Sequence, residues 1–138
     1  MGYSNSEFQV RVDVREGSAV SFGTATASGA VASTDVANMK KFKRRTKVNS
    51  IRLHVTTIPN AASTALVASF LNGTNTFGTA VLTTAALDAY VDVTITTASN
   101  AIFAAADEMK INVSGTATAS AAALGAYDIW IEQQEQFA

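Results

Sequence analysis

The sequence contains no cysteine and only one proline, one histidine and one tryptophan. Without cysteine the chain can form no disulfide framework, no thiolate nucleophile and no cysteine-ligated zinc site. A single histidine also leaves few ways to build a metal centre or a catalytic triad within one chain. Neither a Gly-x-Ser-x-Gly nucleophile elbow nor a glycine-rich phosphate loop occurs. We therefore expect a protein that is not an enzyme and has no cofactor.

Charge and long apolar runs are also scarce. Charged residues make up 15% of the chain, and 10 Lys and Arg nearly balance 11 Asp and Glu, which gives a net charge of -1. This balance does not favour general binding to nucleic acid. No stretch approaches the roughly 20 apolar residues of a membrane helix, and residues 1–9 lack the features of a secretory signal. We expect synthesis in the cytoplasm and no membrane partner.

Small and apolar residues dominate what is present. The chain has 138 residues, of which 48% are hydrophobic, enough for one soluble domain with one core. It contains 26 Ala and 17 Thr, and surfaces of such small side chains suit close packing between neighbouring chains.

Apolar and polar residues alternate with a period of two in several segments, as they do in a strand with one buried face. The five segments are residues 8–14, 51–55, 91–95, 109–113 and 127–131. Residues 65–71 are apolar on both faces, as in a central covered strand, and end at the turn signal Asn72-Gly73. Residues 77–82 are then expected to return as the second arm of a hairpin.

The remaining segments are less regular. Residues 18–36 are rich in Thr, Ala, Ser and Gly and predict one or two weak strands, while residues 83–90 and 101–108 predict loops with at most a single helical turn. Short strands separated by turns predict a single all-β domain, a β-sandwich or jelly roll. We expect residues 1–40 to form an N-terminal extension or arm and residues 41–138 to form the sandwich.

Six of the ten basic residues fall within eight positions: Lys40, Lys41, Lys43, Arg44, Arg45 and Lys47. The rest of the chain is therefore acidic overall. Such a cluster is typical of a solvated surface or of a site for an acidic protein partner. Nucleic acid fits less well, because Phe42 is the only aromatic residue in the cluster and single-strand binders stack bases on several rings.

Other single residues allow few functional interpretations. Trp130 falls on the polar phase of its strand, which favours a role as an anchor between subunits. His54, also on a polar phase, is expected to be a neutral surface or intersubunit residue. Four carboxylates in expected loops could together bind calcium, but they lack the spacing of an EF-hand and are more typical of solvated side chains. These carboxylates are Asp88, Asp92, Asp107 and Glu108.

Residues 42–133 resemble a group of short proteins of tailed bacteriophages, the capsid decoration or cement proteins with a jelly-roll fold. The resemblance lies in the pattern of residues 42–48 leading into 51–59, in residues 71–75 and in residues 126–132. It covers about two-thirds of the chain and is one of pattern and composition, not of a diagnostic motif.

The resemblance implies a structural protein without catalytic residues that binds the exterior of an assembled head, commonly as a trimer, and stabilises it. Its partners would be the major capsid protein and further copies of itself. Subunits would pack through small-residue faces and Trp130, while the segment from Lys40 to Lys47 would contact acidic capsid surface. An alternative is a fibre, tail or other virion β-domain that binds a receptor or carbohydrate, for which exposed aromatic residues in a cleft would be expected.

Overall fold

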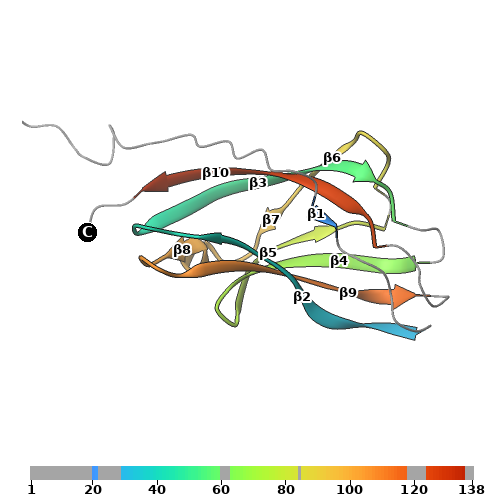
Figure 1. Ribbon diagram of the computed structural model, residues 1–138, viewed down its shortest axis with the longest axis horizontal. Coiled ribbons are helices and arrows are strands. Elements are labelled where there is room, and N and C mark those ends of the chain that lie inside the picture. The colour runs from blue at the N-terminus through green and yellow to red at the C-terminus, as the bar shows by residue number, and fades with distance from the viewer. Residues whose placement is uncertain (1–19, 22–28, 60–62, 84, 118–123, 136–138) are drawn as a thin grey trace, which may run out of the picture.

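The computed structural model describes residues 20–21, 29–59, 63–83, 85–117 and 124–135. These residues form two antiparallel sheets that face each other as a sandwich (Figure 1). The first, here called the β10–β3 sheet, contains in spatial order β1 (Val20–Ser21), β10 (Ala126–Glu135), β3 (Thr46–Thr57) and β6 (Tyr90–Asp92), with β8 (Ile102–Phe103) also paired to β3. The second, the β9–β4 sheet, contains β2 (Gly29–Lys41), β9 (Glu108–Ala117), β4 (Ser63–Asn72), β5 (Asn75–Val81) and β7 (Thr94–Ile95). A short 3₁₀ helix, η1 (Ala98–Ala101), precedes β8.

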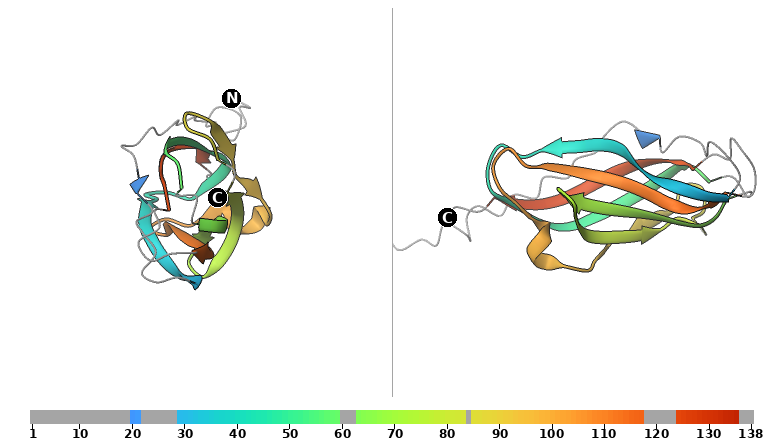
Figure 2. Two further views of the ribbon diagram at one scale, coloured as in Figure 1. Left: turned by 90° about the vertical axis from the view of Figure 1, so that its right-hand side faces the viewer. Right: turned by 90° about the horizontal axis from the view of Figure 1, so that it is seen from below.

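Successive strands alternate between the two sheets, except in the β4–β5 hairpin, which turns at the expected Asn72-Gly73. When the short strands β7 and β8 are set aside, eight strands remain. Their order is first, eighth, third and sixth in the β10–β3 sheet, and second, seventh, fourth and fifth in the β9–β4 sheet. The view from below in Figure 2 shows β2, β9 and β4 side by side. This is the strand order of a jelly roll, so the predicted all-β, jelly-roll-like sandwich is confirmed.

Alternation along β3 and β10 separates a core face from an outer face. Ile51, Leu53 and Val55 are buried between the sheets, whereas the residues between them face outward. The alternation of buried and outward residues in β3 shifts by one position between Val48 and Ile51. Val48 pairs with Gln133 and Ser50 with Glu132, which leaves Asn49 as an extra residue. Such a bulge lets both Val48 and Ile51 point into the core.

The core contains a chain of aromatic contacts that links the two sheets. Phe77 in β5 packs edge to face against Phe103, with ring centroids 5.5 Å apart, and against Phe70 at 6.4 Å. Phe103 also stacks on Phe42 at 4.5 Å. All four rings are fully or almost fully buried, so they provide a large share of the apolar area that the sandwich removes from water.

The structure differs from the sequence-based expectation at residues 91–95, whereas the weak strands expected within residues 18–36 are present as β1 and β2. Residues 91–95 do not form one strand, because the chain crosses from β6 to β7 in the other sheet at the buried Val93. Residues 29–40 belong to β2, which pairs along its length with β9, and Val20–Ser21 pairs with β10. The strand expected at residues 8–14 and the rest of the expected extension lie outside the described residues. Within the described part of the chain, no helix is long and apolar enough to cross a membrane.

Tyr127 is the largest fully buried side chain, and its hydroxyl donates a hydrogen bond to the carbonyl oxygen of Leu124 at 3.1 Å. Burial raises the pKa of the Tyr127 phenol above its ordinary value. The unfolded chain therefore releases this proton above about pH 10, while the folded protein keeps it. The free energy of unfolding should fall above pH 10 by at most about 1.4 kcal/mol per pH unit from this group.

Tyr127→Phe removes this contribution. Urea unfolding between pH 9 and pH 11.5 should show a shallower alkaline loss of stability for Tyr127→Phe than for the unmodified protein. Equal slopes for the two proteins would mean that the pKa of Tyr127 is the same in the folded and unfolded states.

Candidate functional site

Three rows of side chains cross the outer face of the β10–β3 sheet. Strand register brings Ser50 opposite Glu132 in the first row. In the second row, Arg52 of β3 lies between Asp92 of β6 and Trp130 of β10. In the third row, His54 lies between Tyr90 and Asp128. These residues belong to the outward phase of each strand, so they are not required for the core and can contact a ligand or a partner.

Arg52 is the central cation of this face. Its Nε donates a hydrogen bond to Asp92 Oδ1 at 2.7 Å, and its guanidinium carbon lies 5.6 Å from the centre of the Tyr90 ring. The hydrogen bond and the charge of Asp92 raise the pKa of the guanidinium. Both side chains of the ion pair are more than half exposed, so the pair orients Arg52 and contributes little to stability.

His54 lies in a polar environment that includes two carboxylates. Its Nδ1 is 3.4 Å from Asp128 Oδ2 and its Nε2 is 3.6 Å from Asp88 Oδ1. The imidazole also contacts the Tyr90 ring, with the centroids 5.0 Å apart. Among the described residues, the polar contacts of His54 are to these two carboxylates and not to a serine or threonine hydroxyl, so they do not form a nucleophile, base and acid arrangement.

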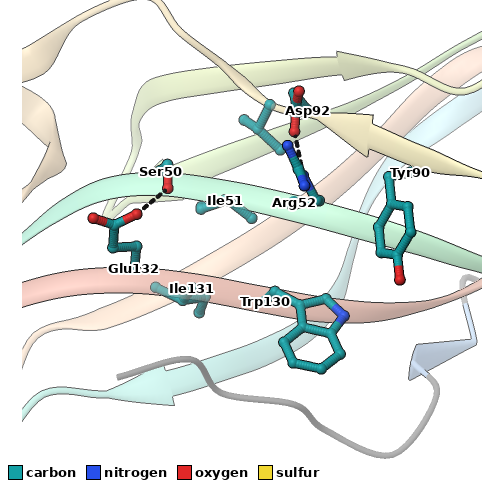
Figure 3. A pocket seen from close by; sticks show the side chains of 9 residues that line it. Ser50, Ile51, Arg52, Tyr90, Asp92, Trp130, Ile131 and Glu132 are labelled. Atoms are coloured by element: carbon teal, nitrogen blue, oxygen red, sulfur yellow. Dashed lines mark hydrogen bonds and ion pairs between the residues drawn. The ribbon is translucent and has the colours of Figure 1, made fainter. Parts of the chain in front are cut away.

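The first two rows and Tyr90 of the third row line a pocket with a volume of about 570 Å³ on the outer face of β6, β3 and β10 (Figure 3). The Arg52–Asp92 pair stands in its middle, with Tyr90 and Trp130 at its sides and Glu132 farther along β10. Tyr90 is 59% exposed. The Nε1 atom of Trp130 is buried and has no hydrogen-bond partner among the described residues. This volume falls within the range of small-molecule sites.

The basic cluster forms the turn between β2 and β3 at one end of the sandwich, the left end in Figure 1. The side chains of Lys41, Lys43, Arg44 and Arg45 are exposed, and Lys47 is half-buried at the start of β3. Lys40 lies in β2 in register with Met109. We call residues 41–47 the basic turn.

Phe42 anchors the basic turn to the core. Its side chain is 2% exposed, its amide donates to the carbonyl oxygen of Asp107 at 3.0 Å, and its carbonyl oxygen accepts a hydrogen bond from the amide of Ala106 at 2.7 Å. The buried Thr46 hydroxyl donates to the Arg44 carbonyl oxygen at 2.8 Å. The one aromatic ring of the cluster is thus unavailable for stacking on a base, while the cations around it point to solvent.

Some cations of the basic turn have no carboxylate partner in the described part of the chain, although Asp107, Glu108 and Glu135 lie beside the turn. Arg44 lies 3.6 Å from Glu135, and in the described part of the chain Lys43 and Arg45 have no carboxylate within 4 Å. The turn therefore presents excess positive charge at this end of the molecule.

The four acids considered for calcium lie in separate contacts. Asp88 faces His54 and Asp92 holds Arg52. Asp107 accepts a hydrogen bond from the amide of Ala104 at 3.0 Å within its own loop, and Glu108 begins β9 opposite Lys41. Across the described ranges, no group of three or more His, Asp or Glu side chains is placed to hold a metal ion.

The structure groups the basic residues but separates them from Trp130. Trp130 lies five residues before Glu135 on β10, which corresponds to roughly 17 Å along the strand. The other polar and aromatic residues of the pocket were not predicted as a group from the sequence: Ser50, Arg52, Tyr90, Asp92 and Glu132. Alternation in the sequence places these residues on outward faces of their strands. This predicts a shared site only once the strand order β10, β3, β6 is known.

Comparison with known proteins finds no matching protein-family model, and no curated protein or solved structure matches the chain significantly.

Proposed function

We propose that this protein is a virion structural protein, a decoration protein that binds the outer surface of a tailed-phage capsid as a homotrimer and stabilises it. The observation that carries the proposal is the basic turn, which presents exposed cations at one end of a jelly-roll sandwich. The resemblance in residues 42–133 supports the same function. In this role the protein acts by binding and has no catalytic step.

The basic turn is suited to an acidic protein surface. Its backbone is already fixed by Phe42 and Thr46, so little conformational entropy is lost when the turn docks. Within the described chain, Lys43 and Arg45 have no ion pair that must break before they bind a carboxylate of the partner. Arginine can also bind a carboxylate with two parallel hydrogen bonds, which adds specificity.

A trimer strengthens weak contacts of this kind. Three basic turns that engage three equivalent acidic sites bind far more tightly than one, because the second and third contacts form at high effective concentration. Charge contacts at the rim of an interface mainly change the association rate and are weakened by salt.

Reversal of the turn's charge tests the proposal. In a variant with Lys43→Glu, Arg44→Glu and Arg45→Glu, we expect co-sedimentation with phage capsids to weaken at least about tenfold at 50 mM salt. The difference should shrink at 500 mM salt, because screening removes the contribution that the mutations abolish.

A control variant with Thr94→Glu and Thr96→Glu adds negative charge at exposed positions outside the turn. It should bind capsids nearly as well as the unmodified protein. Equal binding by all three proteins at both salt concentrations would remove the basic turn from the mechanism.

A further inference from the structure

We propose that the pocket on the outer face of β6, β3 and β10 is a binding site for a neutral saccharide. The proposal does not depend on capsid binding, because the pocket is formed by one chain and lies on a sheet face, away from the basic turn. Its volume of about 570 Å³ is sufficient for a unit of one or two sugar rings.

The aromatic side chains provide the apolar part of the site. Tyr90 and Trp130 flank the pocket, and Tyr90 keeps more than half of its surface exposed in the free protein. A pyranose ring has one face rich in C–H groups, which can cover an aromatic ring and remove it from water. Amphipathic rings such as Tyr and Trp suit this contact because each combines an apolar face with a polar edge.

The polar side chains can satisfy sugar hydroxyls, each of which both donates and accepts hydrogen bonds. Arg52 uses its Nε on Asp92, which leaves its terminal nitrogens as further donors. Asp92 and Glu132 provide acceptor oxygens, and Glu132 is oriented by a hydrogen bond of 3.2 Å from the Ser50 hydroxyl. Because these groups already restrain one another, fewer rotamers are lost when a ligand binds.

Charge selects a neutral ligand. The pocket is lined by one cation, Arg52, and two carboxylates, Asp92 and Glu132, so an anionic sugar or a phosphate would meet excess negative charge. A cationic ligand such as a quaternary ammonium would normally stack on the aromatic face of Tyr90. Here Arg52 lies 5.6 Å from the centre of that ring and would repel it.

Trp130 is the only tryptophan of the chain, so its fluorescence reports directly on the pocket. The full-length protein is titrated separately with glucose, galactose, mannose, N-acetylglucosamine, lactose and cellobiose, and with choline and inorganic phosphate for comparison. We expect a saturable shift in emission with at least one of the six neutral sugars, with a Kd of about 1 mM or below, and no saturable shift with choline or phosphate.

Two variants and one matched control locate the binding. Tyr90→Ala and Glu132→Ala should each raise the Kd for the responsive sugar at least about tenfold, with Trp130 still present as the reporter. Val81→Ala should leave the Kd unchanged, because Val81 is 60% exposed, much as Tyr90 is, but belongs to the β9–β4 sheet.

Three results would each overturn the proposal: no response to any of the neutral sugars, a response to choline or phosphate alone, or equal affinities in Tyr90→Ala and Val81→Ala. Emission that changes with protein concentration and not with sugar would also overturn it, since a second copy would then cover the pocket. The first three results do not bear on capsid binding, so the two proposals can fail separately.

Discussion

Phe77→Ala is expected to lower the free energy of unfolding by about 3–5 kcal/mol. Phe77 is fully buried and contacts Phe70 on the adjacent strand β4 of its own sheet and Phe103 on β8 of the other sheet. Removal of its ring leaves a cavity that the surrounding strands cannot fill, and it breaks two edge-to-face contacts. The loss is a large fraction of the roughly 5–15 kcal/mol by which a domain of this kind is stable.

Urea unfolding followed by circular dichroism measures this loss. Tyr90→Ala is the control, because Tyr90 is an aromatic residue of the outer face and its removal should cost no more than about 1 kcal/mol. A loss below about 1 kcal/mol for Phe77→Ala would show that the aromatic contacts do not hold the two sheets together.

Gly125→Ala is expected to destabilise the protein by roughly 2–5 kcal/mol, for two independent reasons. Gly125 has a φ of 92°, a backbone conformation that residues with a side chain rarely adopt. An added Cβ would also lie 2.8 Å from Cζ of Tyr127 and 2.9 Å from the carbonyl oxygen of Thr57. Tyr127 cannot retreat without opening the core in which it is buried.

Gly73→Ala separates the two reasons. Gly73 has a φ of 62°, but an added Cβ would meet no atom within 4 Å. Only the backbone conformation is then unfavourable, so the loss should be about 1–2 kcal/mol. Thermal or urea unfolding of both variants gives the comparison, and equal losses would contradict the steric account of Gly125.

The regular strands could be predicted from the sequence because their two faces differ strongly in polarity. In β3, β9 and β10, one buried face produces a clear alternation, and the Asn72-Gly73 turn fixes the hairpin between β4 and β5. β2 gave only a weak signal in the sequence, because its residues are mostly small or polar. Apolar and polar residues alternate without interruption through residues 91–95. The alternation therefore could not show that the chain changes from one sheet to the other at Val93.

The candidate sites differ in how far the sequence predicts them. The basic turn is contiguous in the chain, so its residues could be identified before the fold was known. The pocket draws Arg52, Tyr90 and Trp130 from three strands, and their proximity depends on strand order and register. Alternation places each of them on an outward face, but it carries no information about which strands are neighbours.

The proposed binding to the exterior of a capsid can be measured directly. Purified protein is mixed with intact phage capsids over a range of concentrations, and the copies bound per capsid are counted after sedimentation. The account predicts saturable binding that reaches a fixed number of copies, with the bound copies accessible to protease from outside. A pellet without the protein at every concentration, at both low and high salt, would contradict it.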